Sequence, residues 1–290
     1  MVQAVAKLIA SPIFPKESAI SVSTVIVPTD IMATGLWTKE QIKLAFHLYC
    51  QLPYGRIYGR NPEIMALAKV IGRTSDAVAM KMLNIASLDP AITSTGRSGL
   101  GNASALDRAV WDEFHSDWER LAVECELLRQ QLNNTSTPRL EPENDAFLPE
   151  DFTGETRQIL TTQRIKQQFF RRAVLSSYRG RCCMSGLSDA RLLIASHIVP
   201  WSSDRANRLN PSNGLCLSAI HDRAFDKGLI SLTDDFTILI SDDLKRRDDM
   251  FVKEVLLPLN GQKIEPPERF APQPEFVTWH RNSVFLDNQK

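Results

Sequence analysis

One histidine draws attention because of the residues around it. His197 lies in the run LLIASHIVPW, residues 192–201, where an apolar stretch is followed by a polar pair and a proline. The imidazole group titrates near neutral pH, so a histidine aimed from the end of a buried strand can accept a proton from water. The alternative is a core histidine whose ring nitrogens are satisfied by neighbouring groups.

Two further polar residues follow His197 at gaps of 16 and 8 residues, namely Asn213 and His221. The hydrophobic and turn patterns place them at the ends of expected elements. His197 falls at a strand end, Asn213 at a junction between loop and strand, and His221 at a helix start. The predicted elements are a strand at 191–198, a polar loop at 202–214, a strand at 215–219 and a short helix at 221–228.

The blocks ASHI-PW, NGLCL and HDRAFDKG, together with RCCMSG and the basic stretch before it, resemble the HNH endonuclease family. The resemblance spans roughly residues 157–286 and looks like the subgroup common in bacterial restriction and defence nucleases. It implies a ββα-metal fold, which is a β-hairpin followed by a helix. It also implies metal-dependent hydrolysis of phosphodiester bonds in double-stranded DNA.

The resemblance also implies a role for each of the three polar residues. His197 would be the general base that takes a proton from the attacking water, and Asn213 would fix the hairpin loop so that the imidazole is correctly aimed. His221 would be a metal ligand on the helix. The cofactor would be a divalent cation, Mg²⁺, Mn²⁺ or Ni²⁺, which can stabilise charge on the leaving oxygen.

The chain departs from the family at Ser196, where many HNH enzymes have an acidic metal ligand. A hydroxyl is a poor ligand for a hard cation compared with a carboxylate. We therefore expect Asp226 to join His221 as a ligand, with Asp222 as an alternative. Asp226 lies five residues after His221, so a straight helix does not put both on one face.

A structural zinc site, which some family members form with two CxxC pairs, is not expected in this chain. None of its five cysteines forms a CxxC pair. We expect Cys183 and Cys216 to be small buried core residues. The odd cysteine number and the missing pairs favour reduced thiols in a cytoplasmic protein.

The first part of the chain has the pattern of a helical DNA-recognition domain. Residues 62–86 read as helix, short turn and helix, which is the shape of a helix-turn-helix, although an ordinary αα-hairpin has the same pattern. In the DNA-binding reading, Arg73 and Lys81 could reach phosphates or base edges. A single long helix is expected from Ser104 to about Gln131.

The stretch from Arg157 to Arg181 reads as a basic helix with seven positive charges and no acidic residue. Such a face can neutralise phosphates without regard to sequence, and Arg164, Arg171 and Arg172 are its candidate contacts. The alternative is a solvated helix face. Over the whole chain Lys+Arg and Asp+Glu are both 34, so any basic surface must be local.

These patterns together predict an α+β protein with two domains. Its parts are an N-terminal extension at 1–35, a helical domain at 36–131, a linker at 132–156 and the nuclease domain at 157–290. No apolar run of about 18 residues is present, so no membrane association is expected. A homodimer is possible, because cutting both DNA strands often uses two copies of a one-strand site.

Two rival functions stay open at this point. Ser196 favours a catalytically weak or inactive HNH fold that binds DNA as a regulatory protein. RNA as the substrate is also compatible with a site that contacts the nucleic-acid backbone. The recognition sequence, and any dependence on base modification, do not follow from these residues.

Overall fold

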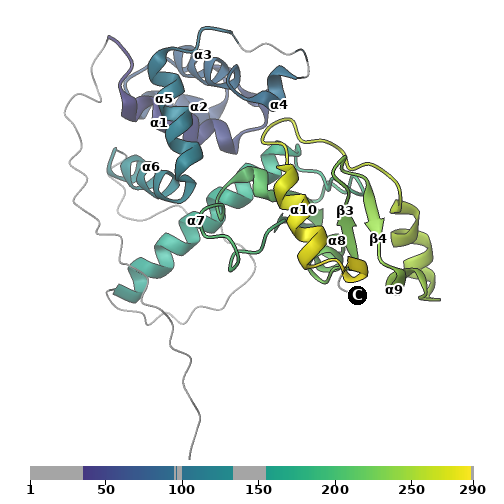
Figure 1. The fold of residues 1–290 in the computed structure, drawn as a ribbon. Coiled ribbons are helices and arrows are strands. Elements are labelled where there is room, and N and C mark those ends of the chain that lie inside the picture. Colours follow the sequence, from purple (N-terminus) through teal and green to yellow (C-terminus); the bar gives the residue numbers. More distant parts are fainter. Residues whose placement is uncertain (1–34, 95, 97–99, 133–154, 289–290) are drawn as a thin grey trace, which may run out of the picture.

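A computed structural model of the chain describes residues 35–94, 96, 100–132 and 155–288, and Figure 1 shows the resulting fold. It combines many helices with two small antiparallel sheets, as expected for an α+β protein. The predicted extension at 1–35 and the linker at 132–156 lie almost entirely outside the described residues. Within the described ranges, no helix is both long enough and apolar enough to cross a membrane.

The N-terminal part is a group of helices that begin at polar caps. Thr38, Asn61 and Thr74 each accept a hydrogen bond from a backbone amide in the first turn of the helix that follows, which stabilises these starts. The helix pair predicted at 62–86 is confirmed as α2 and α3. The helices of this part are α1 (Lys39–Gln51), α2 (Pro62–Val70), α3 (Ser75–Ala86), α4 (Pro90–Thr93), α5 (Ala105–Ser116) and α6 (Trp118–Leu132), with a 3-10 turn at Tyr54–Arg56.

The expectation of a single long helix from Ser104 to Gln131 is wrong, because the helix is interrupted between α5 and α6. Asp117 leaves the helical conformation (φ −156°, ψ 78°), and its carboxylate accepts a hydrogen bond from the Arg120 amide 2.9 Å away. An aspartate that caps a new helix competes with continuation of the old one. The break lets Trp118 enter the core, where it is 1% exposed and packs against Phe114.

The long helix α7 (Glu155–Ser177) connects the two parts of the molecule. It contacts α1 and α6 on the N-terminal side and the first β-hairpin on the other. Figure 1 shows α7 between the N-terminal helices and the C-terminal elements. Phe169 of α7 stacks on His47 of α1 with ring centroids 5.2 Å apart. One hydrophobic cluster includes residues of both parts, so the helices at 36–131 and the segment at 157–290 share a core.

The C-terminal part is built on the hairpin of β1 (Leu193–His197) and β2 (Gly214–Ser218), which pair antiparallel with His197 opposite Gly214. The helix α8 (Ala219–Asp226) packs against both strands. The predicted order of strand, loop, strand and helix is therefore confirmed. The remaining elements are β3 (Ile230–Leu232), β4 (Ile238–Ile240), α9 (Asp242–Lys245) and α10 (Pro274–Ser283), with 3-10 or π turns at Ala190–Leu192, Pro211–Asn213, Val252–Leu256, Leu257–Leu259 and Leu286–Asn288.

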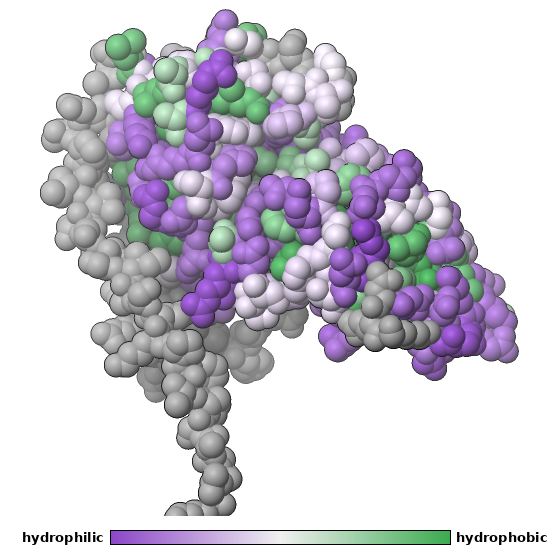
Figure 2. Space-filling view, viewed as in Figure 1, coloured by the Kyte–Doolittle hydropathy of each residue, from purple (hydrophilic) through white to green (hydrophobic). Residues whose placement is uncertain are grey.

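A buried arginine fastens the C-terminal part to the N-terminal helices. Arg269 has no exposed surface and donates hydrogen bonds to the Tyr49 carbonyl of α1 and to the Ser176 hydroxyl of α7. Its guanidinium also lies over the Tyr49 ring, 4.8 Å from the centroid. Polar residues cover most of the face seen in Figure 2, with small apolar patches between them.

Candidate active site

Asn213 holds the loop between β1 and β2 against the end of β1. Its side-chain oxygen accepts a hydrogen bond from the Val199 amide at 2.8 Å, and its side-chain nitrogen donates to the carbonyls of Val199 and Asn207 at 3.1 and 3.2 Å. The Ile198 amide donates to the Asn213 carbonyl at 3.0 Å. Asn213 is fully buried, so these bonds are shielded from water. One side chain thus closes a loop of more than ten residues beside His197.

The residue after Asn213 must be small because β2 passes close to α7. A Cβ atom at Gly214 would lie 2.4 Å from Val174 and 3.0 Å from Phe170, both side chains of α7. Gly214 has an extended backbone with φ −131°, so it does not form a tight turn with Asn213. Gly214 allows β2 to approach α7 closely, which brings the His197 end of the hairpin onto α7.

His197 is the last residue of β1, and one of its ring nitrogens is held by the backbone. Nε2 lies 2.9 Å from the carbonyl oxygen of Arg208, in the loop. A carbonyl can only accept a hydrogen bond, so this contact selects the tautomer with the proton on Nε2. Nδ1 then carries the lone pair, and within the described part of the chain it has no hydrogen-bond partner.

Two aromatic rings fix the plane of the His197 imidazole. Phe170 of α7 stacks on it with centroids 3.9 Å apart and planes 6° apart, and Trp201 meets it edge-on at 5.6 Å. Burial lowers the pKa of His197 below 6.5, and the hydrogen bond with the Arg208 carbonyl offsets part of that effect. The ring is therefore neutral at physiological pH, which is the state a base needs.

His221 lies on the third residue of α8, not at its first residue as expected, because the helix begins at Ala219 after the Ser218 cap. Its Nδ1 is 2.9 Å from the Ser218 hydroxyl and 3.4 Å from the Cys182 sulfur. The residue is 3% exposed, and its Nε2 is buried without a hydrogen-bond partner. A surface groove of about 510 Å³ is lined by His221, Ser218, Ile220 and the segment 185–188.

The carboxylates of α8 lie four residues apart and therefore share one side of the helix. Asp226 is exposed and Asp222 is half-buried. Burial raises the pKa of Asp222, and the neighbouring Ser196 hydroxyl lowers it in part. Burial and the charge of Asp222 raise the pKa of Asp226. Across the described residues, no group of three or more His, Cys, Asp and Glu side chains converges on one metal position.

The thiols near His221 differ in the direction in which their surroundings shift the pKa. Cys183 and Cys216 are buried core residues, as predicted, and burial raises the pKa of both thiols, that of Cys216 to about 12. Burial also acts on Cys182, but hydrogen bonds from His221, Ser185 and backbone amides outweigh it and lower its pKa to about 6. All five cysteines of the chain are free and buried.

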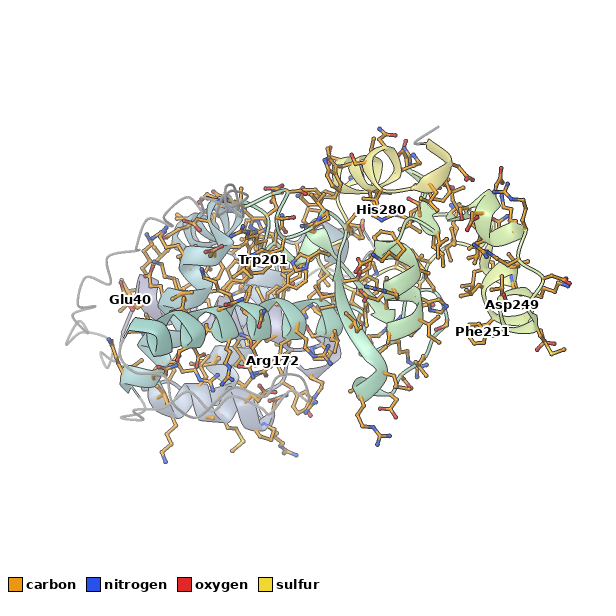
Figure 3. The ribbon with its side chains drawn as sticks, turned by 90° about the horizontal axis from the view of Figure 1, so that it is seen from below. Glu40, Arg172, Trp201, Asp249, Phe251 and His280 are labelled. Atoms are coloured by element: carbon orange, nitrogen blue, oxygen red, sulfur yellow. The ribbon has the colours of Figure 1, made fainter. Side chains whose placement is uncertain are left out.

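Four of the five cations predicted to contact nucleic acid have internal partners. Arg73 donates to the carbonyls of Gly35 and Leu36, and buried Lys81 pairs with Asp107 at 2.8 Å. Arg171 donates to the Leu193 carbonyl at the start of β1, whereas Arg172 pairs with Glu63 of α2. Arg164 is exposed. In Figure 3, Arg172 and Trp201 lie on opposite sides of α7.

Three residues of the site carried no role in the sequence interpretation, namely Phe170, Trp201 and Arg208. Each acts on His197 through a ring contact or a main-chain carbonyl. Phe170 and Val174 are four residues apart and meet Gly214 together, a helical spacing that could have indicated the contact face. No sequence signal identifies a main-chain carbonyl as the partner of a histidine.

Residues 182–233 match the family model described as HNH endonuclease. The matched segment contains β1, β2 and α8 and therefore all of His197, Arg208, Asn213 and His221. An HNH domain is thus present in the C-terminal part of the chain, in agreement with the family suggested by the sequence blocks. No curated protein matches the chain.

Proposed function

We propose that the chain is a metal-dependent endonuclease that hydrolyses phosphodiester bonds in double-stranded DNA. The observation that supports this most strongly is the state of His197. The ring is half-buried between two aromatics and held by a carbonyl at Nε2, and within the described residues Nδ1 has no hydrogen-bond partner. A neutral imidazole with one free nitrogen is a general base for water.

In this proposal His197 accepts the proton of the attacking water at Nδ1, and the resulting imidazolium shares its other proton with the Arg208 carbonyl. The hydrogen bond at Nε2 becomes stronger when the ring is charged. Asn213 keeps the loop that carries this carbonyl next to His197, through its bonds with Val199 and Asn207. The loop therefore aims the base and also stabilises its protonated form.

We infer that a divalent cation is held here by few protein groups. The unpartnered, buried Nε2 of His221 is a nitrogen suited to a metal ligand, and Asp226, or alternatively Asp222, supplies a carboxylate from the same helix. Magnesium and similar ions often use one or two protein carboxylates, with water and substrate phosphate completing the shell. When bound, such an ion stabilises negative charge on the phosphate and on the leaving oxygen.

We further propose that the chain acts in restriction or defence and that the α2–α3 pair recognises DNA. The sequence blocks of the HNH subgroup support the role. The exposed side of α3 bears Asp76 and Met80, whereas Arg73 and Lys81 are held by internal partners. Any DNA contact by this pair must therefore use other groups or follow a rearrangement of these two cations.

The test is cleavage of supercoiled plasmid by the full chain with magnesium, manganese or nickel, and with EDTA in place of metal. We expect nicked and linear products only with a metal ion. Absence of cleavage under all three metals, together with retained DNA binding, would establish the rival function of an inactive regulatory HNH fold. A single-stranded RNA and a methylated plasmid, tested in parallel, define the substrate class.

A further inference from the structure

Arg208 contacts the proposed base His197 through its main chain and places its cationic side chain beside the same histidine. Its carbonyl holds Nε2 of His197, as described above, while its guanidinium Nε donates to the Trp201 carbonyl at 2.8 Å. The guanidinium carbon lies 5.1 Å from the centre of the Trp201 ring. That ring in turn meets the His197 imidazole edge-on. The side chain of Arg208 is therefore ordered beside the base before any substrate binds.

The rest of the Arg208 guanidinium is available to a ligand. Arginine has five N–H donors, of which the contact with Trp201 uses the one on Nε. Across the described ranges, Arg208 forms no ion pair with a carboxylate, and the residue is only half-buried. The two terminal nitrogens form the planar fork that binds two phosphate oxygens together.

Four other arginines in this part of the chain pair with carboxylates, whereas Arg181, Arg205 and Arg223, like Arg208, form no ion pair within the described residues. Arg172 pairs with Glu63, Arg179 with Glu265, Arg191 with Asp189 and Arg281 with Asp234. An arginine that keeps its charge uncompensated in a neutral protein, next to a histidine with a free nitrogen, suits a negatively charged substrate.

We propose that Arg208 binds the phosphate group at which His197 activates water. This inference rests on the proposed nuclease function and names a substrate-binding residue for it. The side chain neutralises one phosphate, and the main chain of the same residue aims the base. Binding of the substrate charge and orientation of the imidazole are thus coupled over a single peptide unit. Trp201 acts as a positioning residue that holds the guanidinium in place.

The variants for the test are Arg208→Gln, Arg208→Lys and, as the matched control, Arg246→Gln. Arg246 follows α9, is exposed and lies 3.9 Å from the Asp243 carboxylate. Asp249, three residues further along the chain, lies far from Trp201 in Figure 3. Each Gln variant removes one positive charge. All Arg208 variants keep the main-chain carbonyl that holds His197, so the tautomer of the base is preserved.

The first measurement is the affinity for a labelled DNA duplex in EDTA as a function of salt concentration. Each phosphate contact contributes about 0.9 to the slope of log K against log salt. We expect Arg208→Gln to lower the slope by about that amount, Arg208→Lys to retain it, and Arg246→Gln to leave it unchanged. An unchanged slope in Arg208→Gln overturns the inference whether or not the wild-type chain cleaves DNA.

The second measurement is the pH dependence of cleavage. We expect Arg208→Gln to lower kcat/KM roughly 10- to 100-fold, the loss typical of a charge-assisted hydrogen bond, with the acid limb of the profile unmoved. A shifted acid limb together with a lower melting temperature assigns Arg208 a purely structural role and overturns the inference. Loss of slope in Arg208→Gln combined with no cleavage by the wild type contradicts only the nuclease function.

Discussion

Two histidines in this molecule have the same kind of partners at the ring face and at Nε2 and differ at Nδ1. His197 stacks on Phe170 and has Nε2 at a carbonyl, and His280 of α10 stacks on Phe225, 3.6 Å between centroids, with Nε2 3.1 Å from the Phe225 carbonyl. At His280, Nδ1 also accepts a hydrogen bond from buried Ser231, at 3.0 Å. At His197, Nδ1 has no such partner in the described part of the chain.

The difference separates a structural histidine from a candidate base. Both rings are neutral, since burial lowers the pKa of His280 to about 4 and that of His197 below 6.5. A lowered pKa therefore does not distinguish the two. The distinguishing property is a lone pair left free, and only a fully assigned hydrogen-bond network reveals it.

The largest expected effect is on catalysis by His197→Gln. Removal of a general base typically costs between about 100-fold and 10,000-fold in rate. We therefore expect plasmid cleavage to fall by at least about 100-fold, while the midpoint of thermal unfolding changes little. Near-wild-type cleavage by this variant would falsify the assignment of the base.

The next effect is expected at Asn213, which fixes the loop around the free nitrogen. Asn213→Ala leaves the buried amide and carbonyl of Val199 and the carbonyl of Asn207 without their partner, at a cost of about 2–4 kcal/mol in the free energy of unfolding. We expect urea unfolding to show this loss and cleavage to fall roughly tenfold or more.

A control for Asn213 is available in the same loop. Asn210→Ala removes a cap whose side chain accepts from the Ser212 amide and donates to the Asn207 side chain, and within the described residues it has no hydrogen bond with Val199. Its cleavage rate should stay within a few-fold of wild type. Equal loss of activity in both variants would mean that the loop as a whole, and not the Asn213 contacts, positions His197.

His280→Ala is the converse test of the comparison. It leaves the fully buried Ser231 hydroxyl unpaired and opens a cavity beside Phe225, so we expect a loss of about 2–3 kcal/mol in the free energy of unfolding. Cleavage per folded molecule should be unchanged. A strong loss of activity without loss of stability would place His280 in the chemistry and contradict the contrast with His197.

The smallest expected effect is a shift in pH dependence. The lowered pKa of His197 means that the neutral base persists below pH 6.5, so kcat/KM should rise with pH along an acid limb centred below 6.5. His280 sharpens the comparison, since its folded-state pKa of about 4 lies under the unfolded value of 6.5. Its contribution to stability is present above pH 6.5 and is lost as the pH falls to about 4.

These two pH effects are measured separately. A pH–rate profile at saturating metal gives the acid limb, and urea unfolding between pH 7 and 4.5 gives the stability. The slope due to His280 should reach about 1.4 kcal/mol per pH unit and disappear in His280→Ala. An acid limb above pH 6.5 would argue against a half-buried, neutral His197.

Much of the hairpin, of α8 and of the α2–α3 pair could be predicted from the sequence, because the local signals in these segments agree. The apolar run before His197, the glycine that ends α8 and the caps of α2 and α3 each specify an element by themselves. The break at Asp117 was missed, since a capping aspartate inside an apolar stripe looks like a surface position. Local patterns predict helices and strands more reliably than they predict the points at which a helix is interrupted.

For the site, the sequence could indicate which residues take part but not which groups they contact. Arg171 and Arg172 look like phosphate contacts in the sequence, yet they bind a carbonyl of β1 and Glu63, residues that lie far away in the chain. The carbonyl of Arg208 and the ring of Phe170 act on His197 through tertiary contacts that no spacing specifies. The metal ligands His221 and Asp226 and the domain boundaries stay predictions.

The central claim is that the free nitrogen of His197 takes the proton of the attacking water. Its most direct test is plasmid cleavage by His197→Ala with and without added imidazole, because deletion of the ring between Phe170 and Trp201 leaves a slot that imidazole can fill. We predict that His197→Ala is almost inactive alone and that imidazole restores part of the cleavage, increasingly as the pH rises through the pKa of imidazole. Cleavage by His197→Ala at the wild-type rate without imidazole would contradict the account.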